Sequence, residues 1–240
     1  MVGLEMDFIK ISYTGKIKDG QVFDTTSDEV AKKEDIHDPQ RIYKPLAVVV
    51  GERQVIEGLD EALAEMKVGD QREVEIPPEK AYGKRDPAQV RLVPLKVFKK
   101  QNMTPVPGMP VELDGQRARI QTVSGGRVRV DFNHELADKT LIFDVKVEEK
   151  ADSDKKKAEF LVEKSFNSLE DFIVDYSKKT LKVSIPQKAY QDRNLLVRKA
   201  SLAAEAYKYL GADEVVFEEV WRNPEKKDAE NKKDSKGKNN

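Results

Sequence analysis

Residues 46–76 read LAVVVGERQVIEGLDEALAEMKVGDQREVEI, and this stretch predicts a strand, a helix and a second strand in immediate succession. Leu46–Val50 is a short apolar run, which is typical of a buried strand. In Leu59–Lys67 the apolar side chains recur at helical spacing, so this segment is an expected amphipathic helix. Gly69 then supplies the left-handed residue at which helices commonly stop. Gln71–Ile76 again reads as a strand, and together the three elements predict one compact unit.

The chain ahead of this unit is expected to be β-structure followed by a polar loop. Apolar and polar residues alternate through Ile9–Thr14, which is the period of a half-buried strand. Asp19-Gly20 is a strong signal for a hairpin turn before the next strand. Residues 25–44 are polar and contain breakers, so we expect them to be irregular.

The composition of the chain changes after residue 86. Residues 87–130 begin with a run of prolines and continue with two turn signals, Asp114-Gly115 and 124–126, between β-like runs. This pattern predicts a small β-rich insert. Residues 141–147 then alternate cleanly and predict a strand that pairs with the N-terminal strands.

A second kind of domain is expected beyond a charged linker at 150–157. Helical and strand patterns follow in the order αββαβ over residues 151–222, which predicts a small α+β layer. Its long helix places Leu196, Ala200 and Tyr207 on one face. Residues 223–240 have no large apolar side chain and are expected to be disordered.

Composition excludes several classes of function. The 240 residues contain 43 Lys and Arg against 44 Asp and Glu, so no overall charge draws the chain to nucleic acid or to acidic membranes. The chain has no cysteine, which excludes disulfides, thiolate metal sites and cysteine nucleophiles. It begins without the pattern of a signal peptide and has no membrane-length apolar run, so we expect a cytoplasmic protein with no membrane partner.

No hydrolytic or metal-binding motif stands out. The only histidines, His37 and His134, are far apart in sequence and are more typical of surface or capping residues than of metal ligands. Ser124-Gly125-Gly126 has none of the surroundings of a phosphate-binding loop. No cofactor and no metal are therefore expected, and the tail offers neither histidine nor cysteine to a metal.

Several short motifs occur in one order over residues 6–86 and 127–149. They are Tyr13-Thr14-Gly15, Gly20–Thr26, Gly51–Leu63, Met66–Asp70, Pro77–Gly83 and Thr140–Val145. This ordered set resembles the FKBP-type peptidyl-prolyl cis-trans isomerases. The insert, and the following Asn133–Ala137, are similar to the SlyD-like branch, in which the flap loop is expanded into an insert-in-flap domain. Residues 151–222 resemble the extra C-terminal domain of long archaeal members in length and element order.

The resemblance implies a fold and an activity. The fold is α+β: an FKBP-like antiparallel sheet wrapped on a short helix (1–86 and 131–150), a β-rich flap insert (87–130) and a C-terminal αββαβ domain (151–222). The activity is rotation about X-Pro bonds, a rotamase reaction that breaks amide resonance against a barrier of roughly 18–20 kcal/mol. Because the twisted amide has less charge separation than the planar one, an apolar pocket that binds the twisted state suffices.

The resemblance also implies the site residues. Tyr13, Phe23, Asp24, Ile56, Tyr82 and Phe143 are the expected catalytic residues. Leu46, Val55, Leu59 and Leu136 are expected to contact substrate, with Leu59 as the floor where many relatives have tryptophan. From periodicity alone, Val55, Ile56 and Phe143 would be core residues of any β-domain, and Asp24 could be a turn cap.

Two hypotheses for the whole chain stay open together. One is an enzyme that isomerises prolines in unfolded or partly folded polypeptides. The other is a chaperone, in which Phe98, Met103 and Met109 of the insert bind unfolded segments, or else form the insert's own core. A nucleic-acid tether through the lysine-rich tail is a third and weaker reading. We also expect a homodimer through residues 151–222, whose short sheet would have exposed edges.

Overall fold

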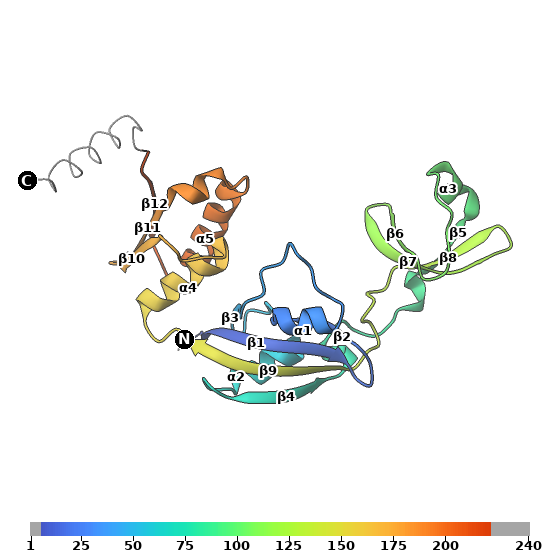
Figure 1. The fold of residues 1–240 in the computed structure, drawn as a ribbon, viewed down its shortest axis with the longest axis horizontal. Helices are drawn as coiled ribbons and strands as arrows, with labels where there is room; N and C mark the ends of the chain where they lie inside the picture. The colour runs from blue at the N-terminus through green and yellow to red at the C-terminus, as the bar shows by residue number, and fades with distance from the viewer. Residues whose placement is uncertain (1–5, 222–240) are drawn as a thin grey trace, which may run out of the picture. The chain divides into compact units, whose positions relative to one another are not determined.

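The computed structural model describes residues 6–221, which form two compact units (Figure 1). The larger unit spans Lys10–Glu149, and the other combines residues 6–9 with residues 150–221. Three sheets and a few helices make the chain α+β, as the sequence predicts. The predicted disorder of 223–240 lies outside the described residues.

A five-stranded sheet forms the body of the larger unit. Its spatial order is β2-β1-β9-β4, and β3 pairs with β1. The predicted pairing of the N-terminal strand with the strand at 141–147 is therefore confirmed, since β1 and β9 are neighbours. The strand bounds are β1 Phe8–Ile17, β2 Val22–Thr25, β3 Leu46–Val49, β4 Gln71–Ile76 and β9 Leu141–Lys150.

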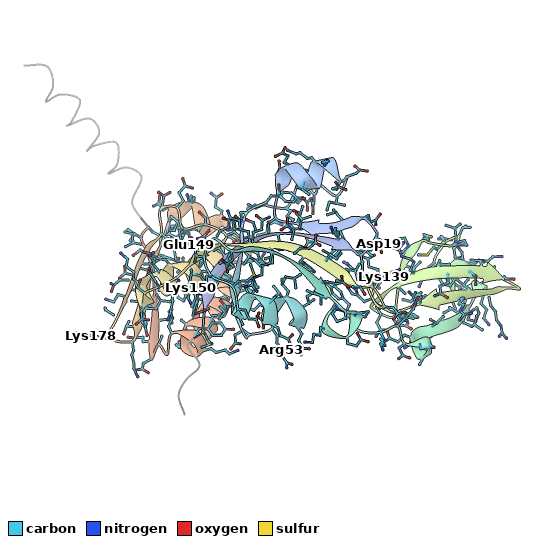
Figure 2. All side chains as sticks on the ribbon, turned by 90° about the horizontal axis from the view of Figure 1, so that it is seen from below. Asp19, Arg53, Lys139, Glu149, Lys150 and Lys178 are labelled. Atoms are coloured by element: carbon cyan, nitrogen blue, oxygen red, sulfur yellow. The ribbon has the colours of Figure 1, made fainter. Side chains whose placement is uncertain are left out.

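The predicted hairpin turn joins β1 to β2. Asp19 has φ 58°, the left-handed conformation that such turns require and that aspartate tolerates. Figure 2 labels Asp19 at this turn and Lys139 just before β9. The Lys18 N–H donates to the Thr140 carbonyl at 2.9 Å, so the turn is tied to the start of β9.

Helix α2, Glu57–Ala64, packs against β4 and buries Leu59 and Leu63. It begins two residues before the predicted Leu59–Lys67, after the N-cap Ile56. It also ends earlier than predicted, because its C-cap is Glu65. A methyl group at Gly58 would lie 2.6 Å from Ile76 Cγ2, so only glycine allows this close approach of helix and sheet.

A short helix lies within the segment expected to be irregular at 25–44, so that expectation is wrong for residues 28–33 and confirmed for residues 34–44. Helix α1 spans Asp28–Lys33, and the Ser27 side chain caps it by accepting from the Val30 N–H at 3.3 Å. Acidic residues occupy its first turn and lysines its last, both favourable to the helix dipole. Only Ala31 is buried, so the sequence shows no apolar stripe that would reveal the helix.

The insert is a separate small sheet with its own core. Its strand order is β5-β8-β7-β6, and all of its pairs are antiparallel. Its elements are β5 Val90–Pro94, α3 Leu95–Lys100, β6 Pro110–Leu113, β7 Gln116–Ser124 and β8 Arg127–Asp131.

Phe98 is completely buried in the core of the insert, at 0% exposure. Its expected role as a displayed contact for client chains is therefore wrong for this structure: α3 turns the ring inward onto Val128 and Val130. Met103 and Met109 are partly buried against the same core. Contact with a partner must therefore come from the residues of the insert that remain at least partly exposed.

The two chain segments that enter and leave the insert are tied together at one residue. The Asn133 carboxamide accepts from the Asp86 N–H at 2.8 Å and donates to the Asp86 carbonyl at 3.0 Å. Close by, the Phe132 N–H donates to the carbonyl of Gln89, which ends the 3-10 turn η2, Pro87–Gln89. Arg85 pairs with the buried carboxylate of Asp131. We call this junction the neck; its residues are Arg85, Asp86, Gln89 and 131–133.

The C-terminal chain folds in the predicted order αββαβ. Strand β10 pairs antiparallel with β11, and β11 pairs parallel with β12, so the sheet is mixed. Helices α4 and α5 pack on each other. Phe8, in the same unit, lies edge-on to Phe160 and Tyr209 with ring centroids 5.5 and 6.1 Å away. The bounds are α4 Asp154–Phe166, β10 Ile173–Ser177, β11 Thr180–Ile185, η3 Gln187–Gln191, α5 Leu195–Tyr209 and β12 Glu214–Glu219.

Candidate functional site

A chain of hydrogen bonds joins three polar side chains from β1, β2 and the loop after α1. The Tyr13 hydroxyl donates to Asp24 Oδ2 at 2.5 Å, and Arg41 Nη1 donates to Asp24 Oδ1 at 2.5 Å. Burial raises the pKa of the Tyr13 hydroxyl, and the hydrogen bond to the Asp24 carboxylate raises it further. Both carboxylate oxygens of Asp24 are thus engaged, which holds its orientation.

The hairpin between β1 and β2 fixes this arrangement through threonines. The Tyr13 N–H donates to Thr26 Oγ1 at 2.9 Å, and the Thr26 N–H donates to the Tyr13 carbonyl at 3.0 Å. The hydroxyls of Thr14 and Thr25 lie 2.9 Å apart. Asp24 therefore lies within a registered strand pair, opposite Gly15, and not in a free turn. Its carboxylate accepts from Tyr13 and Arg41, where a turn cap would accept from backbone N–H groups.

The Phe143 ring contacts the rings of Tyr13 and Phe23, and we call these three residues the aromatic cluster. The Phe143 ring centroid, from β9, lies 5.7 Å from both the Tyr13 and the Phe23 centroids. A methyl group at Gly15 would lie 2.8 Å from Phe23 Cζ and 3.0 Å from Phe143 Cε1. Glycine is required here for space, because any larger residue would push the rings apart.

Tyr82 presents a free hydroxyl to the same region. It follows the 3-10 turn η1, Pro78–Lys80, and its side chain is 38% exposed. Burial raises the pKa of Tyr82, and the negative charge of Asp24 adds to the shift, so the two groups are close enough to interact electrostatically. Within residues 6–221, no hydrogen bond engages the Tyr82 hydroxyl.

The Tyr82 ring is stacked on His134. The two rings are nearly parallel, at 2°, with centroids 4.0 Å apart. His134 Nδ1 accepts from the Leu136 N–H at 3.1 Å, and the Asp138 N–H donates to the Gly83 carbonyl at 2.9 Å. The segment that leaves the insert is therefore joined to Tyr82 by the ring contact and to the neighbouring Gly83 by one backbone bond.

Ile56 precedes helix α2 and offers a second free donor. Its backbone is extended, its side chain is half-buried, and its N–H has no partner among the described residues. The buried carboxylate of Asp60 fixes the loop before it by accepting from the N–H groups of Gly51 at 2.9 Å and Arg53 at 3.2 Å. Arg53, labelled in Figure 2, has φ 52°, a left-handed backbone that this anchoring maintains.

The other expected contact residues occupy the elements around this centre. Leu46 is exposed at the start of β3, which pairs with β1, the strand that carries Tyr13. Val55 is half-buried beside Ile56. Leu59 and Leu136 are almost fully buried, so each can offer a substrate only a small part of its surface.

Two residues of the site were not expected from the sequence. Arg41 lies in a polar loop, where a single arginine carries no signal of its partner 17 residues earlier. His134 was expected to be a surface or capping residue. It does cap a turn, through Leu136, but the stack on Tyr82 adds a contact that sequence spacing does not reveal.

The chemistry available at this centre is noncovalent. The ring faces are apolar and the Asp24 carboxylate is already bonded to Tyr13 and Arg41, while the Tyr82 hydroxyl and the Ile56 N–H are unengaged within residues 6–221. Residues 6–221 contain no group of three or more His, Asp or Glu side chains arranged to hold a metal ion. No helix in that part of the chain is both long enough and apolar enough to cross a bilayer.

Comparison with known families gives two matches outside the sheet of β1, β2, β3, β4 and β9. Residues 91–136 match the family described as "FKBP26, IF domain". Residues 154–222 match the family described as "FKBP26_C-terminal". The first range covers the insert and the segment that contains His134.

Curated relatives match about half of the chain or more. The short-type peptidyl-prolyl cis-trans isomerase of Methanocaldococcus jannaschii is 42% identical over 141 residues, which are 59% of this chain and 89% of that one. A probable FKBP-type 16 kDa isomerase of Pseudomonas fluorescens is 30% identical over 58% of this chain and 85% of its own length. The FKBP-type isomerase SlyD of Helicobacter pylori is 34% identical over 47% of this chain and 63% of its own length.

Proposed function

The chain belongs to the FKBP-type family of peptidyl-prolyl cis-trans isomerases and is such an enzyme, and we propose that it acts on prolines in unfolded or partly folded polypeptides. Uncatalysed X-Pro isomerisation takes tens to hundreds of seconds and can limit folding. An enzyme that shortens this step accelerates the folding of any chain whose prolines it can reach.

The observation that carries the site assignment is the contact of the Phe143 ring with the rings of Tyr13 and Phe23, together with the hydrogen bond from Tyr13 to Asp24. Ring faces offer an apolar surrounding, which favours the twisted amide because it has lost the charge separation of the planar one. The free Tyr82 hydroxyl and Ile56 N–H supply donors for the carbonyls of the bound segment. Binding that fits the twisted state better than either planar state lowers the barrier.

Isomerisation of a proline tetrapeptide, followed by NMR exchange or a protease-coupled assay, tests this assignment. Asp24→Ala should lose most of the activity while the protein stays folded, and Phe143→Ala should lose as much with some loss of stability. Tyr82→Phe removes one hydroxyl and should lower kcat/KM by roughly fivefold, which is the scale of one hydrogen bond. The matched control is Tyr207→Phe on the exposed face of α5. An Asp24→Ala, Tyr82→Phe double variant with wild-type activity would falsify the assignment.

A second activity, chaperone binding through the insert, is favoured by its exposed apolar side chains. Leu92 is 61% exposed and Val106 is 51% exposed, while Met103 and Met109 are only partly covered. Methionine side chains adapt to varied apolar partners. Leu92→Ser with Val106→Ser should weaken the suppression of aggregation of an unfolded protein and leave tetrapeptide isomerisation unchanged.

We propose a homodimer through residues 151–222 as well. The helix face predicted from Leu196 and Tyr207 is largely exposed on α5, with Leu196 at 78%, whereas Leu202 and Ala206 face the unit's own core. Strands β10 and β12 end the sheet on either side. Light scattering should give a dimer for the full chain and a monomer for Leu196→Glu. A wild-type monomer at working concentration would end this proposal.

A further inference from the structure

The insert is the basic part of a nearly neutral chain. Residues 87–131 contain eight Arg and Lys side chains against three Asp and Glu, while the whole chain has 43 against 44. Such a local excess of one charge on a small domain creates a potential that attracts partners of the opposite sign. The position of these positive charges on the insert determines which kind of partner the surface can bind.

Four of these charges lie on one face of the insert's sheet. On β8, Val128 and Val130 point into the core, so Arg127 and Arg129, which alternate with them, point outward. On β7, Ala118 and Ile120 are buried, and Arg117 and Arg119 are exposed. Strands β7 and β8 are neighbours, so the arginines share a surface. We call Leu92, Arg117, Arg119, Arg127 and Arg129 the arginine face.

The acidic groups near this face leave part of it unneutralised. Arg119 already pairs with Glu135 at 3.2 Å, and Arg117 lies opposite Glu112 across the β6–β7 ladder. Arg127 and Arg129 form no ion pair or hydrogen bond through their side chains within residues 6–221. These two side chains are therefore available to a carboxylate from another molecule.

Asp131, at the end of β8, does not neutralise them either. It is only 2% exposed, although it follows Arg127 and Arg129 on the same strand. Its oxygens are taken by Gln121, Asn133 and Arg85 in the neck. A group this buried and this fully bonded does not neutralise arginines on the outer surface.

An exposed apolar side chain accompanies these arginines. Leu92 on β5 is directly opposite Arg129 on β8, and it is exposed on the same face. Strand β5 ends the sheet, and within the described chain it pairs only with β8. An extended polypeptide that runs along this edge has main-chain groups to pair and side chains that reach both leucine and arginine.

We propose that the arginine face binds extended, acidic segments of unfolded polypeptides, so that the insert selects clients by charge as well as by hydrophobicity. This inference rests on the proposed chaperone activity of the insert and names the class of segment that it prefers. The planar guanidinium forms paired hydrogen bonds with a carboxylate, which makes arginine better suited than lysine to this recognition.

A nucleic acid fits the face less well. Single-stranded nucleic acids bind through a basic groove combined with aromatic side chains on which bases stack. Strands β5, β6, β7 and β8 contain no aromatic residue. The face therefore offers charge and a leucine, without the stacking surfaces that bases use.

Fluorescence anisotropy on the full chain tests the proposal with labelled, unstructured peptides that share their apolar residues and carry several Glu, Gln or Lys. A thymidine oligonucleotide is the fourth probe. Wild type should bind the Glu peptide several-fold more tightly than the Gln peptide, and the Lys peptide least. Added salt should reduce the preference for Glu, because exposed ion pairs are screened.

Variants locate the effect on the arginine face. Arg127→Gln with Arg129→Gln should weaken Glu-peptide binding by about fivefold, the scale of two exposed ion pairs, and Lys at both positions should restore part of it. The matched control, Lys99→Gln with Lys100→Gln, removes the same charge from α3 and should leave the preference intact. Tetrapeptide isomerisation should be unchanged throughout.

Two outcomes would overturn the proposal, and they differ from failure of the chaperone activity. Equal binding of the Glu and Gln peptides shows a chaperone without charge selection. Tighter binding of the oligonucleotide than of the Glu peptide shows a nucleic-acid surface instead. If no peptide binds while the isomerase remains active, the chaperone proposal itself fails together with the inference.

Discussion

The aromatic cluster and the arginine face belong to the same unit and are built in opposite ways. The cluster draws its rings from β1, β2 and β9, and the threonines of the hairpin and the Asp24 carboxylate fix them by bonds between distant segments. The arginine face comes from adjacent strands of one small sheet, and two of its charges have no partner within the described chain. A reacting site gains from fixed geometry, whereas a surface that meets many chains gains from groups left free to adapt.

The largest expected effect separates the two regions directly. Replacing residues 87–130 with a short loop should slow catalysed refolding of a proline-limited protein by roughly a hundredfold, because the insert no longer holds the chain near the cluster and raises its effective concentration. Isomerisation of a tetrapeptide should stay within about threefold of wild type, since a tetrapeptide needs only the cluster. Parallel rates on the two substrates check this. Equal proportional losses would mean that the insert only shapes the rim of the site.

Gly15→Ala should damage the cluster and spare the insert. The new methyl group must displace Phe23 or Phe143, and such overpacking commonly costs about 1–3 kcal/mol. We expect tetrapeptide and protein activities to fall together by roughly tenfold, as a ring moves out of place. Aggregation suppression should persist. Kinetics and urea unfolding of the same preparation distinguish a misplaced ring from an unfolded protein.

His134→Ala should have a smaller effect, where the segment that leaves the insert contacts Tyr82. It removes the stack that orients Tyr82, and aromatic stacking contributes about 0.5–1.5 kcal/mol, so kcat/KM should fall by roughly three- to fivefold. His134→Phe keeps a flat ring and should recover most of the activity, although it loses the bond from the Leu136 N–H. A purely structural role through that bond predicts the reverse: equal losses in both variants, with no recovery by phenylalanine.

The smallest expected effect is a loss of stability at alkaline pH, caused by ionisation of Tyr13 in the aromatic cluster. The pKa of Tyr13 is raised in the folded state, so its stabilising contribution is complete below the ordinary pKa of about 10 and is lost as pH rises beyond it. Above that pH the free energy of unfolding should fall by up to about 1.4 kcal/mol per pH unit from this one group. Urea unfolding of Tyr13→Phe should show a shallower decline than wild type. Tyr207→Phe, on α5, is the control, and the slope of its unfolding free energy against pH should match that of wild type.

The sequence predicted those elements of the fold whose pattern of apolar residues lies within a single short segment. Strands Gln71–Ile76 and Thr180–Ile185 were found as predicted, because alternation along a strand reports burial of one face. Helix α1 was missed since it buries only Ala31. The packing of Phe98 was misjudged because nearby prolines show where regular structure stops, not which way the ring turns.

The residues of the site also divide into those that the sequence led us to expect and those that it did not. Tyr13, Asp24 and Phe143 were expected only through the resemblance to a family, since each is an ordinary strand residue by its spacing. Arg41 and His134 act through partners far along the chain, and a single sequence gives no measure of such pairing. The charge of the insert was visible in the sequence, but its concentration on one face needed the register of β7 and β8.

The neck has a consequence for how such proteins can be assembled from parts. Asn133 holds the incoming and outgoing strands together with two bonds to Asp86, so the insert begins and ends at one point of the isomerase body. A domain attached through adjacent ends closes its loop at little entropic cost and can be exchanged without altering the register of the host sheet. Replacing the chain between Asp86 and Asn133 with a different binding domain should therefore yield an active isomerase that binds a different set of polypeptides.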